Sequence, residues 1–276
     1  MKTALLQLNV SDDPVRNLPA TLDLVRQAAE AGAQFILTPE VTNCVSLSRS
    51  HQNAVLQLEE DDQTLAALRD AARRYNVWVL VGSIGLKTND ADGRFANRSF
   101  MIDPSGAVVA RYDKIHMFDV QVTPEETFRE SDGYRPGERA VVADTDFGAV
   151  GMTVCYDLRF PALHRALAQS GARILTVPAA FSPVTGAAHW HVLLRARAIE
   201  TGCFILAPAQ TGTHESATNK TRKTYGHSLV VGPWGEVQLD AGDAPGVYMT
   251  DLDMGQVDKA RGKIPSLANA RSFDGP

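Results

Sequence analysis

The chain is 276 residues long, with 44% hydrophobic and 21% charged residues and a formal net charge of −5. This composition is typical of a globular protein with enough apolar material for a large core, so it excludes disorder over most of the length. The acidic balance and the lack of a basic run argue against a nucleic-acid partner, because phosphate binding needs clustered lysines and arginines.

The first third of the chain alternates short apolar strands with amphipathic helices. Strands are predicted at 3–8, 35–38 and 77–82, with helices at about 14–31 and 61–75 between them. This order predicts right-handed α/β crossovers. Polar residues interrupt the N-terminal apolar stretch, so it is interpreted as a strand and not as an export signal. Because no apolar run approaches the length of a membrane span, we expect no membrane partner.

The middle and the second half of the chain repeat this plan. A hairpin comes first, with strands at 97–102 and 107–112 on either side of an Asp-Pro-Ser-Gly turn. Strand and helix then alternate again, and a second hairpin is centred on a Gly-Pro-Trp-Gly turn. The predicted elements of this part are strands at 141–142, 149–154, 174–177 and 204–207, a helix at 190–199, and hairpin strands at 225–231 and 236–239.

Two copies of an α/β unit followed by a hairpin suggest two sheets packed face to face, with helices outside. The fold class is therefore α/β, as a four-layer α-β-β-α sandwich, although periodicity alone does not separate it from a single wound sheet. No linker or low-complexity stretch interrupts the chain. We expect one domain over residues 1–276, with a loose C-terminal tail from about residue 263.

The cysteine count indicates the compartment. Cys44, Cys155 and Cys203 are an odd and sparse set for a disulfide framework, which favours a reducing, cytoplasmic location. The glycosylation-like tripeptides at Asn97 and Asn219 are then interpreted as chance matches, because no secretion signal accompanies them.

Cys155 lies in the segment GMTVCYDLRFP at 151–161, the most informative stretch of the chain. An apolar run with β-branched residues predicts a buried strand, and Phe-Pro predicts the start of a helix. The thiol is thereby placed on a strand-to-helix turn, where backbone N–H groups can receive negative charge. Such a turn suits a nucleophile. For a single cysteine, however, a packing role in the core is the commoner case.

Two charged residues could complete a catalytic site around this thiol. Glu40 follows the strand at 35–38, and apolar walls at such a strand end can raise the pKa of a carboxyl group towards neutrality. A solvated loop carboxylate is the ordinary alternative. Lys114 follows the first hairpin among apolar neighbours, where an ammonium group could stabilise a developing oxyanion. His116 could act as a base or brace the loop.

Glu40, Lys114 and Cys155 form an ordered set in which each residue closes a strand or a hairpin. With the segments around them, the chain resembles the carbon–nitrogen hydrolase (nitrilase) superfamily, whose catalytic triad is a Glu, a Lys and a Cys in this order. The resemblance covers roughly residues 4–253. It implies the four-layer α-β-β-α sandwich and a homodimer joined through the helical layers.

Within that superfamily the chain looks like a Nit-type amidase. The similar segments are YDKIHMFD at 112–119, CYDLRFP at 155–161 and YGHS at 225–228. A further segment, AHWHVLLRARAIE at 188–200, is closer to deaminated-glutathione amidases than to ω-amidases.

The resemblance also implies further site residues. Glu130 matches a second glutamate that positions the reactants, whereas Glu125 and Glu126 are interpreted as a solvated face. The backbone N–H of Tyr156 would stabilise the oxyanion together with Lys114. The residues that match those holding the keto-acid end of the ligand in Nit-type relatives are Arg159, Phe181 and Thr185. For Arg159 a helix-capping salt bridge is the alternative role.

The expected reaction is cysteine-dependent hydrolysis of a small-molecule amide, with no metal or organic cofactor. Glu40 takes the thiol proton, the thiolate forms a thioester, and water then frees the acid. The expected substrate is a small acidic amide, deaminated glutathione or a related ω-amide, which gives a carboxylic acid and ammonia. The alternatives are an ω-amidase acting on α-ketoglutaramate, an N-carbamoyl amino acid amidohydrolase and a catalytically silent binding scaffold.

Two other catalytic arrangements compete with the triad. A metal hydrolase would use His189 and His191 with His164 or His214, but positions i and i+2 of a helix face different directions and no His-Glu-x-x-His occurs.

A papain-like Cys–His pair with His116 or His227 as base stays open, although it leaves Glu40 and Lys114 without roles. The polar loop at 212–224 either borders the pocket or is mobile.

Overall fold

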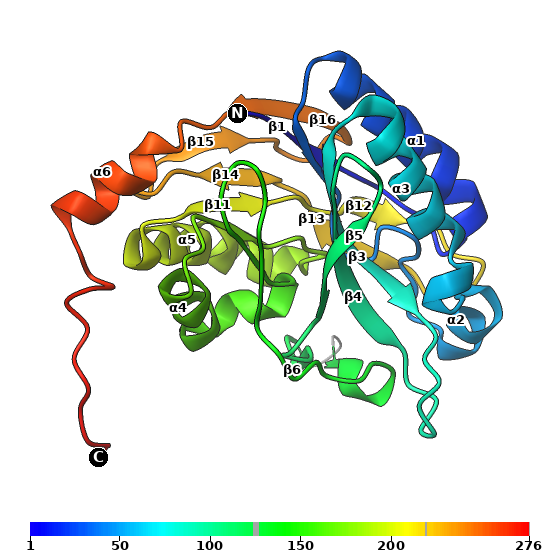
Figure 1. Cartoon of the computed structure of the whole chain (residues 1–276). Coiled ribbons are helices and arrows are strands. Elements are labelled where there is room, and N and C mark those ends of the chain that lie inside the picture. Colours follow the sequence, from blue (N-terminus) through cyan, green and yellow to red (C-terminus); the bar gives the residue numbers. More distant parts are fainter. Residues whose placement is uncertain (124–126, 219, 276) are drawn as a thin grey trace.

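The computed structural model describes residues 1–123, 127–218 and 220–275. Most of its strands lie in two six-stranded sheets (Figure 1). The first sheet contains, from edge to edge, β16 (Gly246–Asp251), β1 (Lys2–Gln7), β2 (Phe35–Leu37), β3 (Trp78–Leu86), β4 (Ala96–Ile102) and β5 (Val108–Asp113). The second contains β15 (Val237–Asp240), β14 (Leu229–Val231), β11 (Phe204–Ala207), β10 (Ile174–Thr176), β9 (Val150–Met152) and β8 (Val141–Ala143).

The two sheets share one plan, which confirms the repeat predicted from the sequence. In the first sheet, β1, β2 and β3 are parallel, β4 and β5 add an antiparallel hairpin, and β16 pairs antiparallel with β1 at the other edge. In the second sheet, β9, β10 and β11 are parallel, β14 and β15 add the hairpin, and β8 pairs antiparallel with β9. Each half of the chain therefore builds one sheet, and β16 completes the first.

Side chains alternate between the two faces of the first sheet, as the period of a strand requires. Leu5 belongs to the core that the two sheets share, with Met152 of β9, whereas Ala4 and Leu6 belong to the core beneath the helices. The sheets therefore pack face to face with helices outside, as predicted (Figure 1). The covering helices are α1 (Pro14–Glu30) and α3 (Gln63–Tyr75) on the first sheet and α4 (Pro161–Gln169) and α5 (Pro183–Thr201) on the second.

The remaining elements are short and lie mostly around the ends of the sheets. A small hairpin, β12–β13, and an isolated bridge between Leu8 and Gln210 lie where the two halves meet. The bounds of these elements are α2 (Arg49–Val55), α6 (Gly255–Lys263), β6 (Asp119–Gln121), β7 (Thr127–Arg129), β12 (Thr211–His214), β13 (Arg222–Tyr225), and the 3₁₀ turns η1 (Glu59–Asp61), η2 (Glu130–Asp132) and η3 (Cys155–Arg159).

One predicted strand is wrong. The segment 225–231 is not continuous, because β13 ends at Tyr225 and β14 begins only at Leu229. Gly226 and His227 between them have φ values of +77° and +56°. This left-handed conformation cannot continue a strand, so the chain turns from one sheet into the other.

One predicted helix boundary also moves. The helix predicted at 190–199 begins at Pro183, since proline is well suited to the first helical position. After α6, residues 264–275 form neither helix nor strand. Within the described part of the chain, no helix combines the length and the apolar content that a membrane span requires.

Candidate active site

Glu40, Lys114 and Cys155 meet between the two sheets, although they come from three separate strand ends. Glu40 follows β2, Lys114 follows β5 and Cys155 follows β9. Lys114 Nζ lies 2.9 Å from Glu40 Oε1, and the Glu40 carboxylate lies near enough to the Cys155 thiol to raise its pKa. The three residues are only 3%, 2% and 7% exposed. Glu40, Lys114 and Cys155 are far apart in the sequence, but the fold brings them into one contact cluster.

Lys114 is held between two carboxylates. Its Nζ donates to Glu40 Oε1 at 2.9 Å and to both oxygens of Glu130, at 2.9 and 2.8 Å. Burial by itself lowers the pKa of Lys114, but the charges of Glu130, Glu40 and Cys155 raise it well above its ordinary value. The ammonium group is therefore a permanent positive charge in a site from which water is largely excluded.

Glu40 is an ionised carboxylate, which corrects the expectation from the sequence. Its Oε1 accepts a bond from Asn97 at 3.0 Å, and its Oε2 accepts the backbone N–H of Ala180 at 2.8 Å. Burial raises the pKa of Glu40, but the positive charges of Lys114 and Arg222 outweigh burial and leave the pKa below its ordinary value. Apolar walls alone would have raised it towards neutrality, whereas the neighbouring cations reverse the sign.

Cys155 rests as a thiol. Burial and the negative charge of Glu40 raise its pKa well above the ordinary value, against the opposing effect of Lys114. Its backbone has φ of +49°, a conformation that is uncommon for a residue with a side chain. The Cys155 N–H donates to the carbonyl of Pro178 at 2.9 Å, which fixes this turn at the start of η3.

The turn that carries Glu40 is strained in the same way. Val41 has φ of +49°, a marked outlier for a β-branched residue. Its N–H donates to Ser83 Oγ at 2.9 Å. The turn packs so closely against Gly82 that a Cβ added there would lie 2.0 Å from the carbonyl oxygen of Thr38. Only glycine permits this approach, and Glu40 is thereby held at a fixed point above the sheet.

Asp157 braces the turn on the other side of the thiol. Its Oδ2 accepts bonds from the Tyr112 hydroxyl at 2.6 Å and from the Val154 N–H at 2.8 Å. Its Oδ1 accepts the backbone N–H of His116 at 3.1 Å and lies 2.7 Å from His116 Nδ1. The His116 ring also stacks on Phe160 at 3.5 Å. His116 therefore braces the loop, which argues against it as a papain-like base.

The histidines of the metal-hydrolase alternative are not brought together. His189 contacts Arg159 at 3.2 Å, His164 Nδ1 lies 3.2 Å from the Phe160 carbonyl, and His214 Nδ1 lies 2.7 Å from the Val10 carbonyl. Among the described residues that line the cavity beside Cys155, none is a histidine.

The cavity at this contact cluster has a volume of about 590 Å³. Tyr156, Phe181 and Thr185 line it, as expected, and Thr185 Oγ1 is buried without a hydrogen-bond partner among the described residues. Arg159 is not among the lining residues. Its guanidinium group lies 5.9 Å from the ring centroid of Tyr156 and 5.5 Å from that of Phe181. Direct substrate contact by Arg159 stays a prediction.

Besides Lys114, four cationic side chains of the described residues line the cavity, and sequence reasoning selected none of these four. The segment 212–224 supplies two and therefore borders the pocket. The four are Arg49, Arg129, Lys220 and Arg222.

Asn97 was also missed. Its Nδ2 donates to Glu40 at 3.0 Å and to Glu130 at 3.4 Å, so the amide joins the two carboxylates. The sequence presented Asn97 only as a chance glycosylation tripeptide, and its position on β4 becomes informative only once β4 is paired with its neighbours. Asn219, Glu125 and Glu126 lie outside the described residues.

Comparisons with known proteins agree with this geometry. The model of the carbon-nitrogen hydrolase family matches residues 2–262. A deaminated glutathione amidase from Yersinia enterocolitica is 41% identical over 269 residues, which are 97% of this chain and 92% of that protein. The crystal structure of the Caenorhabditis elegans NitFhit protein has a TM-score of 0.89 and 32% identity, over 98% of this chain and 65% of that one.

A solved amidase from Nesterenkonia sp. AN1 is also similar. In a mutant of that amidase with glutamine in place of a glutamate, the acetamide moiety of fluoroacetamide is covalently added at the active site cysteine. That structure has a TM-score of 0.78 and 27% identity, over 98% of this chain and 94% of that one.

Proposed function

Because the chain belongs to the carbon-nitrogen hydrolase family and is an amide-hydrolysing enzyme, we propose that it hydrolyses a small acidic amide through a thioester on Cys155. Deaminated glutathione, the compound named for the Yersinia relative, is the first candidate substrate. The observation that carries the proposal is the buried contact cluster of Glu40, Lys114 and Cys155 at the wall of a cavity large enough for such a molecule.

The acylation step uses the resting protonation states of Glu40 and Cys155. The thiol passes its proton to the ionised Glu40 as Sγ attacks the amide carbon. Glu40 and Cys155 can therefore react from their resting states, and the cysteine need not ionise first. Glu40 then gives this proton to the departing nitrogen as the C–N bond breaks. Water next attacks the thioester carbon and passes a proton to Glu40, which returns it to the leaving thiolate.

The negative charge of each tetrahedral intermediate needs a fixed partner. Lys114 Nζ supplies a charge, and the backbone N–H of Tyr156 at the start of η3 supplies a second donor. Removal of one such donor typically costs about 3 kcal/mol of transition-state stabilisation. Glu130 holds Lys114 with two hydrogen bonds, so it acts as a positioning residue.

The charge of the cavity supports an anionic substrate. Arg222 and three other cationic residues line the cavity, in addition to Lys114, which is already paired with Glu40 and Glu130. Arg159 would act through the rings of Tyr156 and Phe181, over which it lies. The leaving group depends on the substrate: a primary ω-amide releases ammonia, whereas the substituted amide of deaminated glutathione releases an amine. The expectation of ammonia therefore applies only to primary amides.

The test offers the purified enzyme deaminated glutathione, α-ketoglutaramate and an N-carbamoyl amino acid in parallel, and measures the released acid and amine by mass spectrometry. We expect the highest kcat/KM with deaminated glutathione. Turnover of only the carbamoyl compound would overturn the substrate assignment. Cys155→Ala should fold and release nothing, and an acyl adduct that adds the mass of the acid product minus one water should appear only when Cys155 is present.

We also propose a cytoplasmic, single-domain protein that forms a homodimer through the helical layers. Val184, Val192 and Ile199 are exposed apolar side chains of α5, which supports contact at this layer. Sedimentation equilibrium of the wild type and of Val192→Glu tests the dimer: we expect two chains in the wild type and one in the variant.

A further inference from the structure

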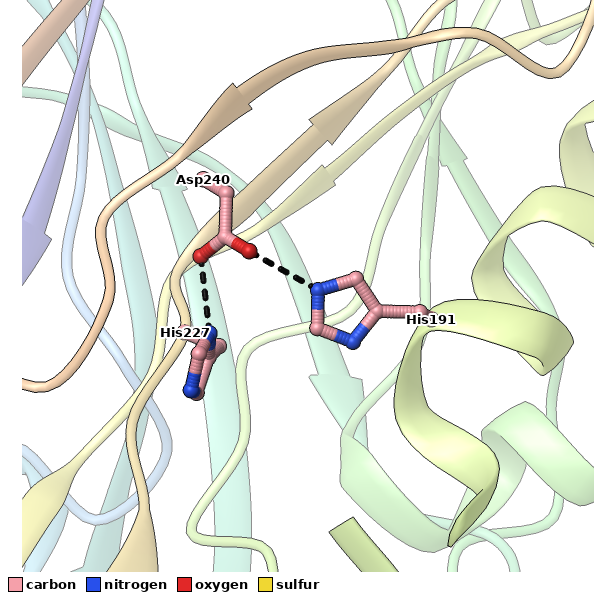
Figure 2. A group of neighbouring side chains, drawn as sticks. All are labelled: His191, His227 and Asp240. Carbon is pink, nitrogen blue, oxygen red and sulfur yellow. Dashed lines mark hydrogen bonds and ion pairs between the residues drawn. The ribbon is translucent and has the colours of Figure 1, made fainter. Parts of the chain in front are cut away.

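A second charged cluster lies outside the cavity, where two histidines and an aspartate come together. His191 comes from α5, His227 from the turn between β13 and β14, and Asp240 is the last residue of β15 (Figure 2). Nε2 of His191 and Nδ1 of His227 each lie 2.9 Å from a different carboxylate oxygen of Asp240. The ligand atoms of the three residues all lie within 4.8 Å of one another, so one ion can contact them all.

Neighbouring groups hold this cluster in place. The His227 ring stacks on Tyr225 with 4.5 Å between centroids, and the His227 carbonyl accepts a bond from Trp190 Nε1 at 2.8 Å. The N–H of Gly242 donates to Asp240 Oδ1 at 2.9 Å. His227 also has φ of +56°, so the surrounding contacts maintain an uncommon backbone conformation that sets the direction of its ring.

The chemistry of the cluster suits a transition-metal ion. Imidazole nitrogen and carboxylate oxygen are ligands that Zn²⁺ and its first-row neighbours accept. Contacts with His191 and His227 and a hydrogen bond from the Gly242 N–H hold both carboxylate oxygens of Asp240 in place. Each imidazole can carry a proton on the ring nitrogen that faces away from Asp240, which leaves the nitrogen that faces Asp240 free to bind an ion.

The dimensions and the exposure of the cluster also fit an ion. Zn–N and Zn–O bonds of about 2.0–2.2 Å at tetrahedral angles place neighbouring ligand atoms roughly 3.3–3.6 Å apart, so the two N···O contacts of 2.9 Å need to open by only about 0.5 Å to admit an ion. The three side chains are between 28% and 33% exposed. An ion can therefore enter from solvent, and water can complete its coordination.

We propose that His191, His227 and Asp240 form a binding site for a divalent transition-metal ion, with Zn²⁺ as the first candidate. The ion ties α5 to the β14–β15 hairpin. It takes no part in amide hydrolysis, because none of the three residues lines the cavity. The proposed ion site nevertheless lies close to the cavity. Trp190 donates to the His227 carbonyl, and its ring packs on that of Phe181 in the cavity wall, with 4.9 Å between centroids.

The test uses the full chain without a polyhistidine tag and with Cys155→Ala, since the thiol is a competing ligand for Zn²⁺. Calorimetric titration with Zn²⁺ should give one ion per chain, and Zn²⁺ should raise the melting temperature. His191→Ala should lose more than about 100-fold in affinity, because the loss of a group that merely supports a ligand already costs about 10- to 100-fold. The matched control is His189→Ala on the same helix, which should bind Zn²⁺ like the parent.

Asp240→Asn is the second variant, because it keeps the shape of the side chain while it removes the charge. It should fold, by circular dichroism, and should lose the stabilisation by Zn²⁺. Equal Zn²⁺ affinity in the parent, His191→Ala and Asp240→Asn would place the ion elsewhere and overturn the proposal. A parent protein that binds no Zn²⁺ would overturn it as well.

Discussion

The hairpins that close the two sheets end in charged clusters of opposite character. Lys114 directly follows β5 and lies between two carboxylates, whereas Asp240 ends β15 and lies between two imidazoles. The positions correspond in the repeated plan of the two halves. They differ in burial, since Lys114 is 2% exposed and the Asp240 side chain is 33% exposed.

This difference in burial separates the roles that we assign to the two clusters. Around Lys114, exclusion of water strengthens each charge, which suits stabilisation of a transition state that appears at one fixed place. Around Asp240, solvent reaches the ligand atoms, which suits an ion that must arrive from solution. One scaffold thus carries the proposed catalytic centre at one hairpin end and a candidate ion site at the other.

The largest effect should follow from Lys114→Met. The substitution leaves the buried Glu40 and the partly buried Glu130 without their shared cation, and breaking a buried pair such as Lys114–Glu40 typically costs about 3–5 kcal/mol of stability. The loss of an oxyanion partner should also lower kcat/KM by about 10³-fold or more. Urea unfolding and steady-state kinetics measure the two effects. Unchanged kcat/KM in a folded variant would remove Lys114 from the mechanism.

Much of this architecture follows from the sequence, because each half presents short apolar strands and helices at regular spacing. The strand ends at Glu40, Lys114 and Cys155 were found in this way. The contacts among these three residues could not be found from local patterns, because such patterns do not show how one sheet packs against the other. The direction of the pKa shift of Glu40 was predicted wrongly for the same reason. The shift depends on Lys114 and Arg222, which are distant in sequence and adjacent in space.

The positive φ values were also beyond reach of the sequence. Val41 and Cys155 are ordinary strand formers by composition, and only the contacts around them impose a left-handed backbone. The cluster of His191 and His227 was hidden because the break after β13 was predicted as continuous strand. That error concealed the residue that turns towards Asp240.

A glycine pair sharpens the contrast between the two halves. In Gly82→Ala the added Cβ would meet the Thr38 carbonyl at 2.0 Å, so the turn that holds Glu40 must move. We expect a loss of roughly 1–3 kcal/mol from overpacking and, for a displacement near 1 Å, about 10²-fold in kcat. Gly171→Ala in the second half is the control, since its φ is +99° but its Cβ meets nothing within 4 Å. It should lose about 1–2 kcal/mol and keep kcat. Equal kcat in both variants would show that the Gly82 contact does not position Glu40.

Arg222→Met should move the acid limb of kcat/KM to higher pH. The midpoint of this limb reports the pKa of Glu40 in the free enzyme, and in the wild type we expect it below the ordinary glutamate pKa of 4.5. Arg222 helps to lower the pKa of Glu40, so its removal raises that pKa. By linkage, a lowered carboxyl pKa stabilises the fold above the unfolded-state pKa, and this stability is lost as pH falls through the folded-state value. Arg222→Met should therefore also unfold at higher pH, whereas Arg159→Met should leave the limb in place.

The smallest effect should come from Asp240→Asn in the absence of metal. The contacts of Asp240 with His191 and His227 are partly exposed, and even a charged pair at such a site contributes only about 0–1 kcal/mol. Urea unfolding in chelator should thus place this variant within about 1 kcal/mol of the wild type, against the much larger loss expected for Lys114→Met. A loss of stability as large as that of Lys114→Met would mean that the Asp240 carboxylate is essential to the structure of the β14–β15 hairpin. The contrast between a buried and a solvent-accessible cluster would then no longer explain why the two hairpin ends differ.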